Sequence, residues 1–294
     1  MNMRDALKKR SNFLAKIRQF FSQNEVVEVQ TAKLLNQPIT DIYIDSIAVK
    51  INGEFNLQTK YLHTSPELEM KKLLANGSGN IYQICSVFRD NEQGDSNFNE
   101  FMMLEYYRLD FDLHQLMQDV EKLLRHLGFE GDLVKLSYAD AFAKFANIDI
   151  LNTDFAQLKV VAKNYGLCTD FAWIEDLQIL LFTHLIEPKL ADFPLCFIFD
   201  YPQQQAALAK ISGQVARRFE LYIFGVEIAN GYDELQDAKA YKQRFQREID
   251  KRAILGKQQF ELDEDFLSTL KTPLPQCSGV AIGIERLLSV KCGL

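Results

Sequence analysis

Strand-like segments of this chain occur in adjacent pairs, and this pairing restricts the fold more than any other feature. Residues 219–228 alternate between apolar and polar side chains on both sides of Phe224-Gly225, a dipeptide that suits a two-residue hairpin turn. Residues 81–89 and 100–108 form a second pair around a polar loop. Neighbouring strands of this kind pair antiparallel, and helical segments separate the pairs. The sequence therefore predicts an α+β fold in which helices flank an antiparallel sheet.

Helical patterns fill the segments between these pairs. Residues 4–22 repeat apolar side chains at helical spacing. Ser65-Pro66-Glu67 combines a capping residue, a first-turn proline and an acid near the positive end of a helix. Residues 113–189 are mostly helical in pattern, and no linker or repeat interrupts the chain. We therefore expect one domain over residues 1–294, with a mostly helical insertion at about 113–190.

Charge and cysteine usage narrow the class of protein. The 294 residues carry a formal net charge of -7, which argues against broad electrostatic binding of nucleic acid. The five cysteines are scattered, without a CxxC pair or a zinc-like Cys/His cluster, as is typical of a reducing compartment. Residues 1–10 are charged and unlike a signal peptide, and the longest apolar run, 177–186, is about half of the roughly 20 residues that cross a bilayer. We expect a cytoplasmic protein without a membrane segment.

An arginine ends the apolar, glycine-containing run of residues 277–286. Small and β-branched residues predict a buried strand, Gly283 predicts a turn, and residues 284–290 predict a helix, so Arg286 is expected near a helix start beside a sheet. A desolvated guanidinium needs an anion, which is either a neighbouring carboxylate or a polyphosphate. The sequence contains neither a GxxxxGK loop nor GxGxxG, so side chains on a sheet would have to hold a nucleotide.

Alternation divides the strand at residues 100–108 into two faces. Phe101, Met103, Glu105 and Tyr107 share one face, and the intervening residues share the other. An aromatic ring, a carboxylate and a phenol on one face suit the stacking of a base and the binding of an amine. The alternative is an aromatic core stripe with an exposed glutamate.

The hairpin at residues 219–228 brings two carboxylates to one face. A turn at Phe224-Gly225 places Tyr222 opposite Glu227, with Glu220 one diagonal step away. The apolar face then consists of Leu221, Ile223, Val226 and Ile228. Adjacent carboxylates repel unless a cation lies between them. The pattern therefore indicates either a magnesium ion held together with substrate phosphates or a solvent-facing acidic pair.

Three separated motifs, taken in this order, resemble the catalytic core of the class II aminoacyl-tRNA synthetases, and specifically the lysyl branch. The strand that ends at Val29-Gln30-Thr31 is similar to motif 1, residues 88–107 to motif 2, and residues 279–286 to motif 3. Thr64-Ser65-Pro66-Glu67 and residues 227–234 resemble lysyl-specific signatures. The match covers nearly the whole chain. It implies an antiparallel sheet flanked by helices, ATP as a substrate, and activation of an amino acid as its adenylate.

The resemblance also implies roles for individual residues. Arg89 and Arg286 would be catalytic, with Arg89 on the α-phosphate and substrate carboxylate and Arg286 on the γ-phosphate. The implied ATP-binding set is Arg89, Phe101 (stacking on adenine), Glu220, Glu227, Gly283 and Arg286, with Mg²⁺ on Glu220 and Glu227. The implied amino-acid set is Ser65, Pro66, Glu67, Glu105, Tyr107, Asn230, Glu234 and Ala281. Within this set Glu67 would contact the α-amino group, and Glu105, Tyr107 and Glu234 would contact the side-chain ammonium.

One branch of these enzymes fits the chain more closely than the others. Motif 1 begins within the first turns, so we expect no anticodon-binding domain and no stable tRNA binding. The chain is more similar to the elongation factor P lysine ligase family, whose members activate (R)-β-lysine with ATP and pass it to the ε-amino group of a lysine on elongation factor P. Ala281 stands where lysyl-tRNA synthetases typically carry glycine, and its methyl group would favour the β-amino isomer. The resemblance also implies a homodimer.

Several positions depart from the family pattern. Ala32 stands where motif 1 has proline, Asn91 replaces the motif 2 glutamate, and Asp95 and Asn97 replace basic or histidine residues of the motif 2 loop. Three functions therefore stay open from the sequence. They are a protein-modifying ligase for β-lysine or lysine, a lysyl-adenylate-forming or tRNA-charging enzyme, and a catalytically weakened binding or regulatory paralogue.

Overall fold

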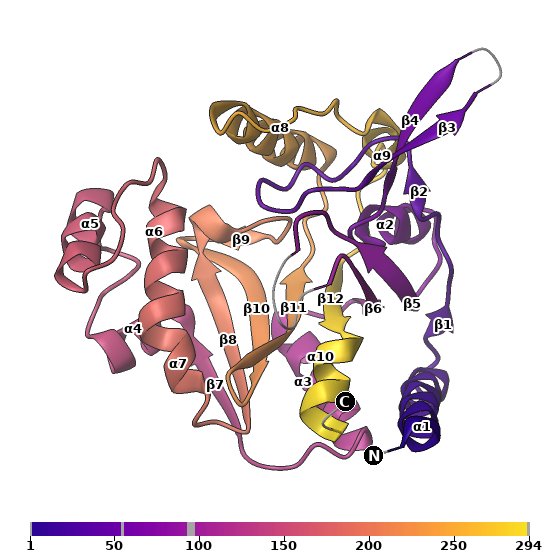
Figure 1. Ribbon diagram of the computed structural model, residues 1–294, viewed down its shortest axis with the longest axis horizontal. Coiled ribbons are helices and arrows are strands. Elements are labelled where there is room, and N and C mark those ends of the chain that lie inside the picture. The colour runs from indigo at the N-terminus through magenta and orange to yellow at the C-terminus, as the bar shows by residue number, and fades with distance from the viewer. Residues whose placement is uncertain (1, 54–55, 93–97, 293–294) are drawn as a thin grey trace. The chain divides into compact units, whose positions relative to one another are not determined.

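The computed structural model describes residues 2–53, 56–92 and 98–292, and Figure 1 shows its helices and strands. The chain divides into two compact units. Unit 1 consists of Met1–Asp112 and Glu234–Leu294, and unit 2 of Leu113–Asp233. Unit 2 begins where the helical insertion was expected to begin and continues through the strands that follow it. The expectation of a single domain stays a prediction.

Unit 1 contains a sheet in which neighbouring strands run mainly antiparallel. β5 (Ile81–Phe88) pairs with β6 (Glu100–Leu109), and β6 pairs with β12 (Cys277–Gly283), both antiparallel, while β1 (Val27–Glu28) joins β5 in parallel. The register aligns Tyr107 with Gly279 and Glu105 with Ala281. The predicted pairing of residues 81–89 with 100–108 and the predicted strand before Gly283 are therefore confirmed.

The helix α1 (Met3–Gln23) covers one face of this sheet. Its Phe21 ring stacks on Tyr82 of β5, with 4.3 Å between centroids, and meets Tyr106 of β6 edge-on at 4.9 Å. Because residues two apart in a strand share a face, Phe101, Met103, Glu105 and Tyr107 lie on the face away from α1. The two-face division expected from the sequence is thus confirmed.

The remaining elements of unit 1 surround this sheet. A small antiparallel sheet has the order β2 (Leu34–Leu35), β4 (Leu57–Leu62), β3 (Ala48–Asn52). The helices are α2 (Glu67–Ala75), α8 (Ala238–Ile254), α9 (Glu264–Thr269) and α10 (Ile284–Cys292). Pro66 occupies the N-cap position of α2, so Ser65 does not cap this helix as the sequence pattern had indicated. The buried Arg252 of α8 donates to Asp45 Oδ1 and to the Asp41 carbonyl, each at 2.7 Å, and so fixes the segment before β3.

Unit 2 has its own strands and helices. Its strands follow the order β11 (Val226–Asp233), β10 (Val215–Ile223), β8 (Leu195–Pro202), β7 (Leu133–Ser137), and β9 (Ile211–Ser212) pairs with β10. β7 and β8 are parallel, and the other pairs are antiparallel. The helical elements are α3 (Leu113–His126), α4 (Tyr138–Ala146), α5 (Phe155–Asn164), α6 (Ile174–Leu181), a π-helix (Phe182–Ile186), α7 (Glu187–Leu190) and a 3₁₀ helix (Gln203–Gln205).

Aromatic and aliphatic side chains fill the core of unit 2. Tyr138 stacks on Phe182 with 5.1 Å between ring centroids, and Tyr201 lies 4.8 Å from Tyr138. The apolar run at residues 177–186 contributes Leu177, Leu181 and Ile186 to this core. Within the described ranges, no helix combines the length and apolar character that crossing a membrane requires.

The Phe21 contact with the sheet generates a stability prediction. Replacing Phe21 by alanine removes a fully buried ring from between α1 and the tyrosines, which costs about 3–5 kcal/mol of unfolding free energy. Urea denaturation of Phe21→Ala and of the wild-type protein measures this loss.

Leu7→Ala is the control from the same helix. The Leu7 side chain is 59% exposed, so its truncation is expected to change the unfolding free energy by about 0.5 kcal/mol or less. Equal losses in the two variants would contradict the packing of α1 on the sheet.

Candidate active site

The face of the unit 1 sheet away from α1 combines polar side chains on β6 with small residues on β12. Gly279 pairs with Tyr107, Ala281 pairs with Glu105, and Gly283 continues the same face opposite Met103. Since directly opposed residues point to the same side of a sheet, the small β12 residues leave room beside the Glu105 and Tyr107 side chains. This arrangement makes a floor on which other groups can converge.

Glu105 carries a buried carboxylate whose two oxygens have different surroundings. Glu105 is only 3% exposed, and its Oε1 accepts a hydrogen bond from the Tyr107 hydroxyl at 2.5 Å. Oε2 is buried, and no group among the described residues forms a hydrogen bond with it. Burial, followed by the charge of Glu67, raises the pKa of Glu105 to about 8. A buried carboxylate in this state is suited to an incoming cation.

Two further carboxylates near Glu105 form ion pairs with the same lysine. Lys71 of α2 is fully buried, and its Nζ lies 2.6 Å from Glu67 Oε1 and 2.7 Å from Glu234 Oε2. Burial opposes the charge of Lys71, but the nearby charges of Glu234 and then Glu67 hold its pKa well above the usual range. The structure therefore brings together Glu67, Glu105, Tyr107 and Glu234, as the amino-acid set required.

Lys71 did not emerge from the sequence. A signal existed, because Lys71 follows Glu67 by four residues in a helical segment, and side chains at that spacing are neighbours. An i,i+4 pair is common on exposed helices, however, and nothing local shows that this one is buried against Glu234.

Gly279 is required by the closeness of these groups. A methyl group at this position would overlap Tyr107 Cε1 and lie 2.7 Å from Glu234 Oε1. Contacts this short do not occur between real side chains. The main-chain N–H of Glu234 also donates to the Cys277 carbonyl at 3.1 Å, which holds Glu234 beside the start of β12. The glycine thus permits Tyr107 and Glu234 to meet above the strand.

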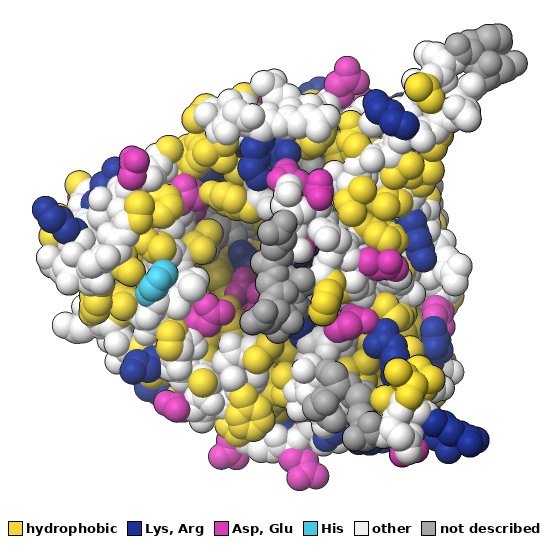
Figure 2. All heavy atoms as spheres, in the orientation of Figure 1, with side chains coloured by type: hydrophobic (Ala, Val, Ile, Leu, Met, Phe, Trp, Pro, Cys, Tyr) yellow, Lys and Arg dark blue, Asp and Glu magenta, His cyan; other side chains and the backbone are white. Residues whose placement is uncertain are grey.

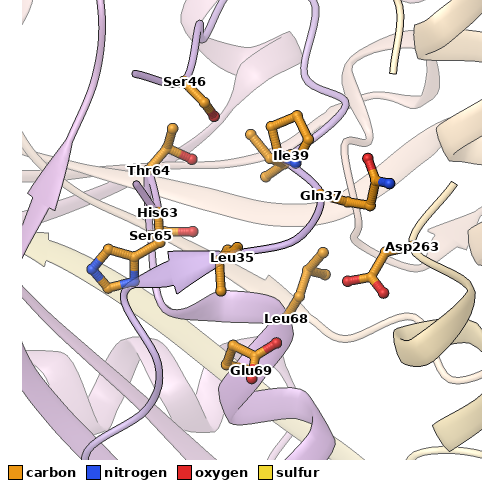
Figure 3. Close-up of a pocket in the computed structure, with 11 residues that line it drawn as sticks. Leu35, Gln37, Ile39, Ser46, His63, Thr64, Ser65, Leu68, Glu69 and Asp263 are labelled. Carbon is orange, nitrogen blue, oxygen red and sulfur yellow. The ribbon is translucent and has the colours of Figure 1, made fainter. Parts of the chain in front are cut away.

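Ser65, another predicted amino-acid contact, lines a small pocket next to α2. Figure 3 shows the Ser65 side chain in this pocket with His63, Glu69 and Asp263. The complete lining is Leu35, Gln37, Pro38, Ile39, Ser46, His63, Thr64, Ser65, Leu68, Glu69 and Asp263. Glu67, two residues after Ser65, is not in this lining, and its carboxylate pairs with Lys71 instead.

Arg89 and Phe101 lie together at one end of β5 and β6. The guanidinium carbon of Arg89 is 5.1 Å from the centre of the Phe101 ring, and Arg89 Nε donates to the Thr64 carbonyl at 3.5 Å. Asn91, where the motif 2 glutamate is missing, adopts a left-handed backbone with φ of 59°. Asp95 and Asn97 lie outside the described residues.

Arg286 lies in the first turn of α10, near the helix start as predicted. The turn predicted at Gly283 is wrong, because Gly283 is the last residue of β12 and α10 begins at Ile284. Its neighbour Glu285 fixes the start of this helix, because Oε2 accepts the Met102 N–H at 2.8 Å and Oε1 pairs with Arg10 at 2.9 Å. A methyl group on Gly283 would reach the Arg286 side chain at 3.8 Å, an ordinary contact. Gly283 and Arg286 are therefore adjacent, as expected for residues of one binding motif.

The remaining predicted residues, Glu220, Glu227 and Asn230, lie in the β10–β11 hairpin of unit 2. The turn at Phe224-Gly225 is confirmed, with φ of 47° and 79°, and Tyr222 pairs with Glu227. A β-bulge at Leu221/Tyr222 then shifts the register, so Glu220 pairs with Asn230. Val226 pairs with the buried Ile223 and so shares its face as predicted, although Val226 itself lies beside the turn and is 41% exposed.

Glu220 is held by protein groups on both oxygens. Oε1 pairs with Arg218, and Oε2 accepts hydrogen bonds from the hydroxyls of Tyr201 at 2.7 Å and Tyr222 at 2.6 Å. Among the described residues, no cluster of three or more His, Cys, Asp and Glu is placed to hold a metal ion. A pair of carboxylates fits Mg²⁺ only when substrate phosphates complete the coordination, which is the usual arrangement for this ion.

Charged side chains of both signs occur on the surface of the protein. Figure 2 shows Lys and Arg side chains interspersed with Asp and Glu on the face turned to the viewer.

Comparison with known proteins places the chain in a family. Residues 1–294 match the family of class II tRNA synthetases (D, K and N). The elongation factor P–(R)-β-lysine ligase of Pectobacterium atrosepticum is 41% identical over 291 residues, which are 96% of this chain and 89% of that protein. The proteins of the same name from Haemophilus ducreyi and Avibacterium paragallinarum are each 39% identical, over 96% and 97% of this chain and 88% and 90% of their own lengths. The chain therefore belongs to the class II tRNA synthetases (D, K and N), within the family of elongation factor P–(R)-β-lysine ligases.

Proposed function

We propose that this ligase activates (R)-β-lysine with ATP and transfers it to the ε-amino group of a lysine on elongation factor P. The relatives with 39–41% identity are named elongation factor P–(R)-β-lysine ligases, which supports (R)-β-lysine and elongation factor P as the two substrates. The resemblance of the motifs supports ATP as the energy source, a homodimer as the assembly and the cytoplasm as the location.

The observation that carries the proposal is the buried carboxylate cluster of unit 1. Glu67, Glu105 and Glu234 converge with the ammonium group of Lys71, and within the described part of the chain no group hydrogen-bonds to Glu105 Oε2. An uncompensated carboxylate costs several kcal/mol when it is removed from water. A substrate that brings its own ammonium groups removes this cost, whereas a neutral side chain does not. A lysine-like amino acid is the matching substrate class.

The proposed ATP contacts in unit 1 lie at the ends of its strands. Arg89 is assigned to the α-phosphate and the substrate carboxylate, Phe101 to the adenine ring, and Arg286, with Gly283 beside it, to the terminal phosphate. Arginine suits these positions because its fork of N–H groups matches phosphate oxygens and keeps its charge at every working pH.

The proposed magnesium ligands are Glu220 and Glu227 of unit 2, together with phosphate oxygens. Bound there, Mg²⁺ would neutralise the charge that collects on the leaving pyrophosphate. The protein's part is to hold the carboxylates. Arg218, Tyr201 and Tyr222 keep the Glu220 side chain in one orientation.

The proposed reaction has two steps. A carboxylate oxygen of the amino acid attacks the α-phosphorus of ATP, the bond from this phosphorus to the β-phosphate bridging oxygen breaks, and pyrophosphate leaves with the electron pair. The ε-amino nitrogen of the acceptor lysine then attacks the adenylate carbonyl carbon. An amide bond forms, AMP leaves, and the nitrogen loses a proton. Positioning and charge stabilisation by the arginines supply the catalysis.

Pyrophosphate exchange with ATP tests the first step. Wild-type enzyme is expected to exchange fastest with (R)-β-lysine, more slowly with α-lysine and not at all without an amino acid. If the folded protein fails to exchange pyrophosphate with every amino acid tested, the result would point instead to a binding or regulatory paralogue.

The acceptor is tested separately. Purified elongation factor P should gain the mass of one β-lysyl group, and unmodified tRNA incubated under the same conditions should not. Charging of tRNA in place of the protein would overturn the proposed acceptor.

The raised pKa of Glu105 gives a pH prediction. Only the ionised carboxylate attracts the substrate ammonium, and with a pKa of about 8 the ionised fraction falls about tenfold for each pH unit below that value. The kcat/KM for the amino acid should therefore rise with pH and level off above about 8, while the KM for ATP stays constant. Glu105→Gln should lower kcat/KM and remove this limb. If the pH dependence of kcat/KM stays unchanged in Glu105→Gln, it belongs to the titration of another group.

Gly279→Ala tests the closeness of the site groups. The added methyl group would overlap Tyr107 and the Glu234 carboxylate, so one of them must move away from the substrate. We expect the KM for the amino acid to rise about tenfold or more, because displaced contacts to a buried ammonium are costly, with the KM for ATP within about twofold. A variant with normal amino-acid affinity would show that the two groups do not close on the substrate.

Ala281→Gly tests the isomer preference. Ala281 pairs with Glu105 across the strands, so its methyl group belongs to the wall beside the proposed ammonium site. Removing it should shift the ratio of kcat/KM values for β-lysine and α-lysine toward α-lysine, by about tenfold at most for one methyl group. The ratio measured in pyrophosphate exchange decides this, and an unchanged ratio would remove Ala281 from the account of specificity.

A further inference from the structure

The ammonium group of Lys71 is surrounded by two carboxylates and an aromatic ring of the same chain. Its Nζ contacts Glu67 Oε1 at 2.6 Å and Glu234 Oε2 at 2.7 Å, and it lies 5.4 Å from the centre of the Tyr241 ring. Two carboxylates and an aromatic face are the groups that recognise ammonium ligands. Lys71 is fully buried, so this is not a surface ion pair of small effect.

Lys71 connects two parts of the site that are far apart in the sequence. Glu67 lies on α2 with Lys71, whereas Glu234 precedes α8 and is bound through its N–H to Cys277 of β12. Without a cation between them, these two buried carboxylates repel each other. The ammonium group therefore keeps both in place before any substrate arrives, and such preorganisation reduces the cost of binding.

The charge balance of the cluster also depends on Lys71. With all three carboxylates ionised, Lys71 cancels one of the negative charges of Glu67, Glu105 and Glu234, which leaves two. An amino acid with two ammonium groups matches that remainder. Because Lys71 sets the net negative charge that remains on the cluster, it determines how many positive charges a matching substrate must carry.

We propose that Lys71 is a positioning and specificity-determining residue, which orients Glu67 and Glu234 and leaves Glu105 to receive the terminal ammonium of a diamino acid. This inference rests on the proposed function. It assigns Glu234 to the support of the pocket through Lys71 in addition to its predicted contact with the substrate.

The titration of Glu105 reports on this role. The titratable groups that influence it are Glu67 and Lys71 on α2, Cys85 on β5, Tyr107 on β6, and Glu234 before α8. Lys71 and the Tyr107 hydrogen bond favour the ionised form of Glu105, and Glu67 and Glu234 oppose it. Loss of the Lys71 charge must therefore raise the pKa of Glu105 further.

The test compares Lys71→Met with Lys72→Met. Lys72 is the next residue of α2, and it pairs with Glu69 at 2.7 Å in the partly exposed part of the helix, so it serves as a matched control. In Lys71→Met, the KM for the amino acid should rise about tenfold or more, and the acid limb of kcat/KM should move up by about one pH unit or more, with the KM for ATP unchanged. Lys72→Met should keep both values.

A second readout does not depend on activity. Carboxyl ¹³C resonances of labelled glutamate, with Glu105→Gln for assignment, give the titration of Glu105 in folded protein. It should move up by about one pH unit or more in Lys71→Met, whereas in Lys72→Met it should match the wild type. If the wild-type enzyme fails to activate any amino acid, the proposed function falls, and this titration still decides the role of Lys71.

Folding of the variants is controlled by circular dichroism and by a double variant. If Lys71→Met does not fold, Lys71→Met with Glu67→Gln removes one charge of each sign and should restore the fold, because replacing both partners of a buried pair avoids an unpaired charge. Glu105 should then titrate within about half a pH unit of the wild-type value. An acid limb and a Glu105 titration that stay in place in folded Lys71→Met would overturn the inference, as would a double variant in which Glu105 shifts by about one unit or more.

Discussion

A carboxylate that leaves water must meet a cation or a set of hydrogen-bond donors, and this requirement organises unit 1. Glu67, Glu105 and Glu234 come from a helix, a strand and a connecting segment, and each is buried or nearly so. Lys71 satisfies two of them and Tyr107 donates to the third. What they leave is one Glu105 oxygen that meets no hydrogen-bond donor in the ranges the structure describes, beside a floor of small residues. The selectivity proposed for the enzyme follows from this remainder.

The sheet makes such a cluster possible because its two faces do different work. The face toward α1 is packed with aromatic rings, which hold β5 and β6 in place. The other face then carries charged groups on strands that these ring contacts support. Gly279 is the clearest sign of this division, since a single methyl group there would collide with both Tyr107 and Glu234. Binding sites need this kind of support, because displaced contacts to a charged ligand lose much of their energy.

The β10–β11 hairpin of unit 2 illustrates how a local irregularity decides which side chains are neighbours. A regular ladder from the Phe224-Gly225 turn would pair Glu220 with Ala229, but the bulge pairs it with Asn230. Bulges add a residue to one strand and leave little trace in the pattern of apolar residues. The turn was predictable from its dipeptide, and the register two residues beyond it was not.

Local chemistry in the sequence determined the antiparallel pairing, the two faces of β6, the turn at Phe224-Gly225 and the place of Arg286 in the first turn of a helix after a buried strand. Each of these depends on residues close together in the chain, through side-chain alternation, turn geometry or helix spacing. The motif resemblance supplied the amino-acid set, of which Glu67, Glu105, Tyr107 and Glu234 do converge. Only the tertiary structure decided that Lys71 stands between Glu67 and Glu234, that Glu105 keeps an open oxygen, and that Gly279 is required. The reason is physical: burial and charge compensation are properties of groups that meet across long stretches of chain, and no local pattern records the distance between them.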